Sequence, residues 1–253
     1  MIRIGLLAST SLTDFNLETI KPVTEDKNFV VALVIIDIRP KLTLKQKIRK
    51  NFKRGRGGYM LIMAVQSYFN KKKPTYDTKS YCVEHSIDFI ETAKPYAPET
   101  IEKLKHYNLD LLALTGGFGI IKEPMLKLTP MGVLSYHHGN MRTYRGMPPA
   151  FWELYHHEKE MGVTVQLLSS GLDCGVPVEE KTIRIDAKDS LETLRERAMD
   201  ESVDMLYKAM KKLSSEDFVP QRIEKFGKIY TLPNLSQWLV FKLKLFSRKI
   251  MRR

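Results

Sequence analysis

The chain has 253 residues, of which 43% are hydrophobic and 28% charged, with a formal net charge of +12. This length suits one α/β domain with appendages, and no apolar run reaches the roughly 18 residues that suggest a membrane-spanning helix. The only two cysteines, Cys82 and Cys174, offer no framework of disulfide bridges, and residues 1–8 lack the pattern of a secretory signal. We therefore expect a reducing, cytoplasmic location.

The positive charge is concentrated in two segments. Twelve Lys or Arg and no acidic residue lie between Arg39 and Lys73, and six more lie between Asn234 and Arg253, again without an acid. Since these eighteen cations exceed the net charge of +12, the rest of the chain sums to −6. We expect an acidic body with two basic appendages, and the appendages suit anionic partners such as phosphorylated substrates, phospholipid head groups or nucleic acid.

Apolar runs bounded by turn residues predict buried strands, and helical periodicity lies between them. The predicted strands are residues 2–7, 29–36, 87–90, 109–114, 132–136, 163–168 and 181–185. The predicted helices are residues 12–20, parts of 42–69, 98–107, 149–157 and 190–213, the last capped by Asp189 or Ser190. This alternation predicts an α/β, Rossmann-like fold: an open, mostly parallel sheet with helices on both faces and ligands at the carboxyl ends of the strands.

Both basic segments mix cations with apolar side chains. The cationic part of residues 39–73 ends in three glycines and is followed by the apolar residues 59–69 and by three lysines at 71–73, whereas the tail interleaves Trp238, Phe241 and several leucines with cations. Such segments suit peripheral contact with the anionic inner face of a membrane. The alternative is a helix that packs on the body and keeps its lysines in water.

Several motifs are missing or weak. No G-x-G-x-x-G follows the first strand and no G-x-x-x-x-G-K-[ST] occurs, which argues against dehydrogenases and P-loop NTPases. The pairs at 137–138 and 156–157 are adjacent histidines, which do not share one face, so we expect no metal site. Cys174, between an aspartate and a glycine, is interpreted as a small turn residue rather than a nucleophile.

The residues that can carry chemistry lie between Gly132 and Gly175. A buried strand ends in a loop containing Ser135, His137, His138 and Asn140, and a later strand ends in the tight turn 171–175. A histidine at a strand's carboxyl end and Asp173 from the next strand's turn would converge, giving a general acid or base and the carboxylate that orients it. From the pattern alone, a satisfied loop histidine and a turn aspartate remain an alternative.

This segment resembles the folate-dependent formyltransferases, the family that includes methionyl-tRNA, glycinamide ribonucleotide and sugar N-formyltransferases. Their signature runs Asn-x-His, then a substrate loop with Tyr or Trp followed by Arg-Gly, and later Gly-Leu-Asp-x-Gly. The run Tyr144-Arg145-Gly146 sets the register, which places the family's catalytic histidine on His137 and its aspartate on Asp173. The resemblance covers about residues 2–213 and implies the formyltransferase fold.

The resemblance also implies a donor site and a substrate loop. Residues 110–122 resemble the strand and glycine turn whose backbone helps hold the pterin of 10-formyltetrahydrofolate. It implies donor contacts from Gly116, Gly117, Phe118, Gly119, Ile120, Leu172 and Asp173, and no metal. It implies a substrate loop that includes His138, Gly139, Tyr144, Arg145 and Gly146. The expected layout is a catalytic domain at residues 1–213 with a basic helical insertion at 39–73, followed by a basic amphipathic extension at 214–253.

One position departs from the family. In these enzymes an amine attacks the formyl carbon, an imidazolium such as His137 would stabilise the oxygen, and Asp173 would help to move a proton. The family's asparagine, which donates a hydrogen bond to the oxyanion, is replaced here by Ser135. Either Ser135 substitutes, or Asn140 or His138 supplies the donor, or transfer is slow or lost; we expect retained chemistry.

The acceptor is expected to be a small, anionic amine. Residues 214–253 are too few for the C-terminal tRNA-gripping domain of methionyl-tRNA formyltransferases, so tRNA is not expected. The basic segments favour an amino sugar on a nucleotide or lipid carrier in polysaccharide or glycolipid synthesis, with a purine precursor as the alternative. A competing class is a non-catalytic or regulatory protein that keeps the folate pocket. The oligomeric state is not predicted, and a homodimer stays open.

Overall fold

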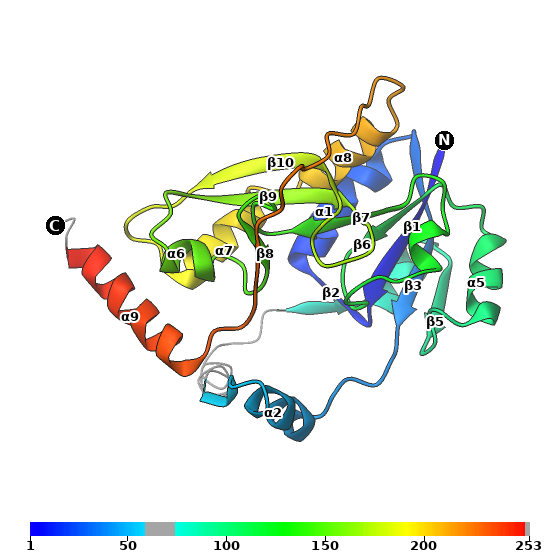
Figure 1. Ribbon diagram of the computed structural model, residues 1–253. Coiled ribbons are helices and arrows are strands. Elements are labelled where there is room, and N and C mark those ends of the chain that lie inside the picture. Colours follow the sequence, from blue (N-terminus) through cyan, green and yellow to red (C-terminus); the bar gives the residue numbers. More distant parts are fainter. Residues whose placement is uncertain (59–73, 251–253) are drawn as a thin grey trace.

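The computed structural model describes residues 1–58 and 74–250, and seven strands of these residues form its central sheet (Figure 1). In chain order the strands are β1 (Ile2–Ser9), β3 (Phe29–Asp37), β5 (Phe89–Thr92), β6 (Leu111–Leu114), β7 (Val133–His137), β9 (Glu160–Leu167) and β10 (Val176–Arg184). Their order in space is β10-β9-β7-β6-β1-β3-β5. Strands β1, β3, β5, β6 and β7 are parallel, and β9 runs antiparallel to both of its neighbours. The predicted α/β, mostly parallel sheet is confirmed.

Helices cover both faces of this sheet because side chains of successive strand residues alternate between two apolar clusters. In β1, Ile4 and Leu6 belong to one cluster and Leu7 to the other. The first cluster includes side chains of α1 (Asp14–Glu25), α7 (Leu191–Asp200) and α8 (Met205–Leu213). The second includes side chains of α5 (Pro98–Lys105) and of the short 3₁₀ helix η1 (Met125–Lys127).

The helix predicted at 190–213 is divided into α7 and α8, and Tyr136 from β7 lies at the break. Its hydroxyl donates to the carbonyl of Ser202 at 2.7 Å and accepts from the backbone N–H of Leu206 at 3.0 Å. An uninterrupted helix would join that N–H directly to that carbonyl, four residues earlier. The inserted hydroxyl therefore replaces one helical hydrogen bond, while Ser190 caps α7 as predicted.

Smaller elements lie around the edges of the sheet. A two-stranded pair joins β2 (Ser11–Thr13) to β4 (Thr75–Asp77), which leads into α4 (Thr78–Glu84), a helix that the periodicity did not predict. A second pair joins β8 (Tyr144–Gly146) to β11 (Lys228–Tyr230). In the first basic segment, α2 (Leu44–Phe52) forms with Thr43 as its cap. The apolar residues 59–69 and the lysines at 71–73 lie outside the described residues.

The C-terminal helix α9 (Leu235–Ile250) packs on the body through one side. Phe241 is 1% exposed, and its ring centroid lies 4.4 Å from that of Phe151 in α6 (Phe151–Tyr155). The Lys244 ammonium donates to the carbonyl of Tyr155 at 2.7 Å. The sequence left two alternatives for the tail, membrane contact and packing on the body, and this side of α9 packs on the body. Among the described helices, none has both the length and the hydrophobicity that crossing a membrane requires.

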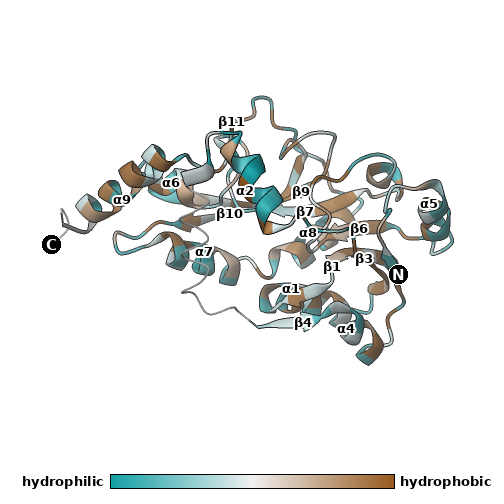
Figure 2. Ribbon diagram, turned by 90° about the horizontal axis from the view of Figure 1, so that it is seen from below, coloured by the Kyte–Doolittle hydropathy of each residue, from teal (hydrophilic) through white to brown (hydrophobic). Residues whose placement is uncertain are grey.

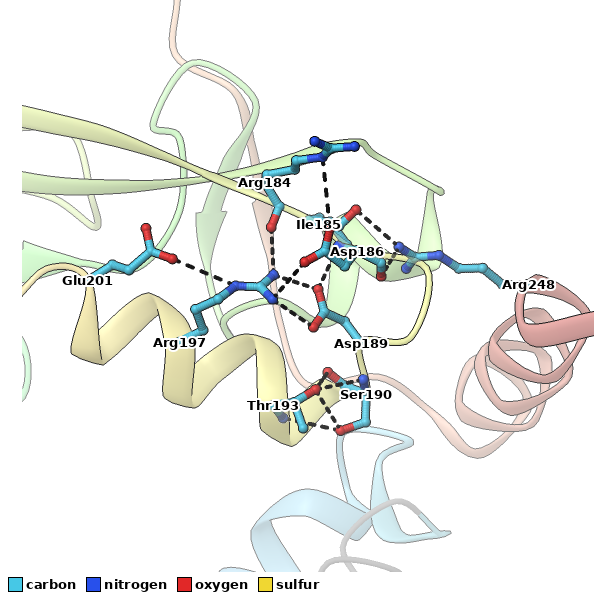
Figure 3. Close-up of polar contacts among 9 residues, drawn as sticks. All are labelled: Arg184, Ile185, Asp186, Asp189, Ser190, Thr193, Arg197, Glu201 and Arg248. Carbon is cyan, nitrogen blue, oxygen red and sulfur yellow. Dashed lines mark hydrogen bonds and ion pairs between the residues drawn. The ribbon is translucent and has the colours of Figure 1, made fainter. Parts of the chain in front are cut away.

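An ionic cluster fixes the far end of α9 to the loop between β10 and α7 (Figure 3). The Arg248 guanidinium donates to the carbonyl of Asp186 at 2.6 Å. Arg197 of α7 donates to both carboxylate oxygens of Asp189 in this loop, at 3.1 and 2.6 Å, and to the carboxylate of Asp186 at 3.1 Å. Asp189 is 5% exposed, so its carboxylate is shielded from solvent, and the paired hydrogen bonds from Arg197 hold the loop in place.

Candidate active site

The imidazole of His137 and the carboxylate of Asp173 lie next to each other. Nδ1 of His137 is 3.4 Å from Oδ2 of Asp173, and the side chains are only 7% and 16% exposed. That separation is longer than an ordinary hydrogen bond between these atom types. The imidazole and the carboxylate are 36 positions apart in the sequence, and they lie together where little water can reach them.

The route by which Asp173 reaches His137 differs from the simple prediction of two strands ending at one edge. Because β9 is antiparallel to β7, its last residue, Leu167, lies opposite Leu134, at the other end of β7 from His137. The loop 168–175 must therefore fold back across the face of the sheet. Asp173 itself has a φ of 46°, in the left-handed region that aspartate tolerates better than most residues.

Asp173 is held in place by hydrogen bonds independent of the histidine. The backbone N–H of Gly146 donates to Oδ2 at 2.7 Å, and the side-chain amide of Gln166 donates to Oδ1 at 3.4 Å. The same amide of Gln166 accepts from the N–H of Gly175 at 3.0 Å, so one buried glutamine fastens both the loop and its carboxylate. Sequence reasoning missed Gln166, although a polar residue inside the apolar run 163–168 was the available signal.

The second ring nitrogen of His137 is held by the backbone. Nε2 lies 2.8 Å from the carbonyl oxygen of Tyr144 in β8. Gly139 passes so close that a Cβ on it would be 2.6 Å from Nε2 and 2.9 Å from that oxygen. Both ring nitrogens thus face acceptors, so an imidazolium can donate to the two of them, and glycine is the residue that leaves room for this contact.

The strand that supplies this carbonyl is itself supported by the C-terminal segment. Strand β8 pairs in parallel with β11, and the guanidinium of Arg145 donates to the carbonyl of Gly227 at 2.8 Å while lying over the ring of Phe226 at 5.2 Å. Arg145 also donates to the carbonyl of Leu172 at 3.4 Å, one residue before Asp173. Residues 226–230, within the predicted extension, are therefore part of the framework of the site.

The side chain of Tyr144 points away from His137 into an aromatic group. Its hydroxyl donates to the carboxylate of Glu158 at 2.7 Å and lies 3.2 Å from Nδ1 of His156. Its ring centroid is 5.2 Å from that of Tyr230. Burial, together with the neighbouring Glu158 carboxylate, raises the pKa of Tyr144 above its ordinary value, so the phenol stays protonated and serves as a donor.

His138 occupies the opposite face of β7. Its ring stacks on Tyr136, with centroids 5.6 Å apart and planes at 15°, and lies 5.8 Å from Phe15 of α1. Its Nε2 has no hydrogen-bond partner, and burial lowers the pKa of the imidazole to about 4. The structure therefore does not bring His138 together with His137, and a neutral ring packed among aromatics does not suit the predicted donor role.

The other two candidate donors lie near His137. Ser135 is two residues earlier on the same face of β7, is 8% exposed, and its hydroxyl donates to the carbonyl of Tyr136 at 3.3 Å. Asn140 caps a turn: its side-chain oxygen accepts from the N–H of Arg142 at 2.9 Å, and its carbonyl accepts from Tyr144 at 2.7 Å. Ser135 therefore shares the site face, whereas the side chain of Asn140 is engaged locally.

The predicted donor turn follows β6, whose last residue, Leu114, pairs with Ser135 of β7. Gly117 has a φ of +90°, and a Cβ there would be 2.9 Å from the backbone of Ser9, so only glycine fits the turn. Phe118 is buried under the turn, whereas Ile120 is 56% exposed and Leu172 is 36% exposed. Leu172 directly precedes Asp173 in the chain, so one of these exposed apolar side chains lies next to the catalytic candidates.

A partly buried ion pair that sequence reasoning missed supports this turn. The guanidinium of Arg39 donates to both oxygens of Asp37, at 2.8 and 2.7 Å, and to the carbonyl of Phe118 at 2.8 Å. These hydrogen bonds hold the pKa of the Asp37 carboxyl below its usual range. The signal was an aspartate and an arginine two residues apart at the carboxyl end of a strand. Among the residues that the structure describes, no cluster of His, Cys, Asp or Glu is arranged to hold a metal ion.

Comparison with known proteins identifies the class to which this fold and site belong. Residues 49–210, more than half of the chain, match the family model described as "Formyl transferase", so the chain belongs to the formyl transferase family. The α/β Rossmann-like fold of that family is the fold described above.

Particular relatives are similar over different parts of the chain. A methionyl-tRNA formyltransferase of Citrifermentans bemidjiense is 25% identical over 209 residues, which are 83% of this chain and 58% of that protein. A methionyl-tRNA formyltransferase of Ruminiclostridium cellulolyticum is 32% identical over 46% of this chain and 37% of its own length. The chain thus spans about half the length of the curated relatives it matches.

Solved structures of two further kinds share the fold. Glycinamide ribonucleotide transformylase 1 of Symbiobacterium toebii aligns with a TM-score of 0.57 at 22% identity, over 88% of this chain and 95% of that one. The N-formyltransferase of Helicobacter canadensis, solved with folinic acid and dTDP-3-aminofucose, aligns with a TM-score of 0.60 at 12% identity, over 97% of this chain and 81% of that one. At these identities the likeness concerns the fold.

Proposed function

We propose that this protein transfers a formyl group from 10-formyltetrahydrofolate to a small amine, with His137 and Asp173 as its catalytic residues. The observation that carries the proposal is their contact at 3.4 Å, with each partner anchored separately by Tyr144 and by Gly146. A pair held in this way keeps its geometry while a substrate approaches, which is what general acid–base catalysis requires. The bound donor would supply the electrophilic carbonyl and the amine leaving group.

The two side chains have different roles in the proposed reaction. The carboxylate of Asp173 is an acceptor and takes a proton from the incoming ammonium or amine. The positive charge of the His137 imidazolium would stabilise the carbonyl oxygen on which negative charge gathers, while the Tyr144 carbonyl keeps the ring oriented through Nε2. Asp173 would stabilise the cationic ring until it takes the amine proton, and that proton would then pass to the folate N10 as the bond between the formyl carbon and N10 breaks. Ser135, on the same face, is our choice for the second donor to that oxygen, with the amide nitrogen of Asn140 as the alternative.

The turn 116–120 with Leu172 is proposed to hold the folate. Gly117 and Gly119 keep its backbone open to a ligand, and Arg39 fixes the Phe118 carbonyl. Tyr144-Arg145-Gly146, with Gly139, would line the acceptor side of His137 and shape the approach of the amine. Each of these roles is a proposal that extends the geometry described above.

For the acceptor we propose an amino sugar carried on a nucleotide or a lipid, used in polysaccharide or glycolipid synthesis. Two features support this choice: the Helicobacter canadensis protein, solved with a dTDP-amino sugar, aligns over 97% of this chain, and the two basic segments suit an anionic carrier. The cytoplasm, including its membrane face, is the proposed location. A purine precursor is the second candidate, because the chain also aligns with glycinamide ribonucleotide transformylases.

The test is an assay of formyl transfer from 10-formyltetrahydrofolate to dTDP-amino sugars, glycinamide ribonucleotide and methionyl-tRNA. The products are identified by mass spectrometry. We expect transfer to an amino sugar and none to methionyl-tRNA. Transfer to glycinamide ribonucleotide alone would replace the acceptor and keep the chemistry. Folate binding without transfer to any amine would contradict the proposal and favour a regulatory protein that retains the folate pocket.

A further inference from the structure

The helix α9 has two different sides. One side is anchored on the body through Phe241, Lys244 and Arg248, as described above. The opposite side exposes Leu239 (51%), Leu243 (69%) and Phe246 (66%), spaced by four and three residues, so they form a continuous apolar stripe along the helix. Folding has therefore placed large apolar side chains in water on a helix whose other side is already fully engaged.

The helix α2 is also exposed, and it is strongly cationic. It has no buried residue, and its Leu44 and Phe52 are 64% and 58% exposed. Its exposed cations are Lys45, Lys47, Arg49 and Lys50. No acidic residue lies between Arg39 and Lys73, so no carboxylate of the segment itself neutralises this charge. Thr43 and Gln46 form a capping box at the start of the helix.

The structure brings these two segments together, although about 180 positions separate them in the sequence. A Cβ added at Gly58, shortly after α2, would lie 2.9 Å from Cβ of Leu235, the first residue of α9. Figure 1 shows α2 beside the start of α9, and Figure 2 shows hydrophobic turns along α9 and mostly hydrophilic colouring on α2. We call α2 together with the outer side of α9 the basic apolar face.

We propose that the basic apolar face docks the protein onto the surface of a bilayer that contains anionic phospholipids. An interfacial helix buries its apolar side at the acyl boundary while its cations meet lipid phosphates. Lys242 suits this arrangement, since it is exposed beside the stripe with its ammonium 5.1 Å from the Trp238 ring centroid. The stripe would insert and α2 would supply most of the electrostatic attraction.

Two other occupants fit the same observations less well. Nucleic acid phosphates would neutralise the cations of α2 but would leave the stripe of α9 in water. A second copy of the chain would bury the stripe, but a twofold interface places the same surface on both partners, so cationic helices would lie close together. A bilayer with anionic lipid satisfies both the apolar and the cationic components.

This docking is independent of the proposed formyl transfer, and the experiment separates the two. The full chain is mixed with vesicles of phosphatidylcholine alone or of equal parts phosphatidylcholine and phosphatidylglycerol, and binding is measured by co-sedimentation at low and high salt. We expect binding to the anionic vesicles only, weakened by salt. His137→Ala should bind vesicles as the wild type does, and transfer to a soluble acceptor should be unchanged in the stripe variant below.

Two variants test the two components. The stripe variant combines Leu239→Ser, Leu243→Ser and Phe246→Ser, and its control is Val83→Ser on α4, which is 66% exposed in the wild type. The charge variant combines Lys45→Gln, Lys47→Gln and Lys50→Gln, and its control replaces the exposed Lys27, Lys103 and Lys188. We expect the stripe variant to lose more than about tenfold in partition coefficient and the charge variant about a hundredfold, at about fivefold for each lysine. Both controls should stay near the wild type.

Four results would overturn the proposal: no binding of the wild type to anionic vesicles, equal binding to neutral vesicles, unchanged binding by both variants, or equal losses in variants and controls. Analytical ultracentrifugation and a filter assay with RNA identify the alternative occupants. A concentration-dependent dimer that the stripe variant abolishes, without vesicle binding, would assign the face to a second copy. RNA binding that the charge variant abolishes, without vesicle binding, would assign it to nucleic acid.

Discussion

The two faces of β7 at its carboxyl end carry adjacent histidines with opposite properties. His137 faces loops, and both of its ring nitrogens have acceptors, the Asp173 carboxylate and the Tyr144 carbonyl. His138 faces helices and aromatic rings, its Nε2 has no partner, and its pKa is lowered to about 4. Since the residue type is identical and the positions are neighbours, the surroundings alone decide which ring can carry a proton in a reaction.

The difference follows from what covers each face. The face of His137 is covered by the short strand β8 and the loop 168–175, so it offers a carbonyl, a carboxylate and the amide of Gln166 of β9 close together. The face of His138 is covered by α1 and α8, whose backbone groups are occupied within their own helices. A site for acid–base chemistry can therefore form on one side of this strand and not on the other.

The largest expected effect comes from replacing each of the two histidines in turn and comparing the variants. His137→Ala should lower kcat for formyl transfer by about 10³-fold, within the range found for the loss of a general acid or base. His138→Phe, which keeps an aromatic ring beside Tyr136, should stay within a few-fold of the wild type. Steady-state kinetics of both variants with the same acceptor checks this contrast. Comparable losses in the two variants would remove the distinction between the faces.

A smaller effect is expected from crowding His137 without removing it. In Gly139→Ala the new Cβ would sit 2.6 Å from Nε2 of His137 and 2.9 Å from the Tyr144 carbonyl oxygen, so the ring or β8 must shift. A displaced catalytic group typically costs about tenfold to a hundredfold in rate. We expect kcat to fall while folate binding, measured by fluorescence titration, changes little. Unchanged kcat would show that the contact with Tyr144 does not position the ring.

The smallest effect concerns stability and isolates His138. Its folded pKa of about 4 lies below its ordinary 6.5, so the unfolded chain binds more protons between these values. Stability contributed by the neutral buried ring is complete above pH 6.5 and is lost as the pH falls, by up to about 1.4 kcal/mol per pH unit. Urea unfolding across this window should show a shallower pH dependence for His138→Phe. Equal slopes would mean that His138 does not titrate in this way.

The sequence was sufficient for features that depend on local pattern. The apolar runs located six strands of the sheet to within about three residues, whereas β10, predicted from the alternation at 181–185, begins at Val176. Alternation with helices predicted the mostly parallel arrangement of the sheet. Motif spacing selected His137 and Asp173, whose side chains the structure places together. These succeed because period and spacing are properties of a short stretch of chain.

The remaining features depend on contacts between distant segments. The apolar run of β9 does not indicate whether the strand is parallel or antiparallel to β7, because either direction buries the same side chains. The break between α7 and α8 comes from the hydroxyl of Tyr136, a residue of another strand. Pairing of β8 with β11 and the contact of Arg39 with Phe118 likewise need three-dimensional positions. The family resemblance grouped His138 with the site, and the structure places its ring on the opposite face of β7 from His137.

The pairing of β8 with β11 has a consequence for how the protein is made. A ribosome synthesises the chain from the N-terminus, so β11 (Lys228–Tyr230) leaves the ribosome long after β8, the strand with which it pairs. The sheet can collapse around its core early, whereas the carbonyl that orients His137 acquires its final position only after residues 228–230 have been synthesised. Nascent chains should therefore become compact before the His137 ring is correctly oriented. Chains that end before residue 226 should fold but leave this ring without its support.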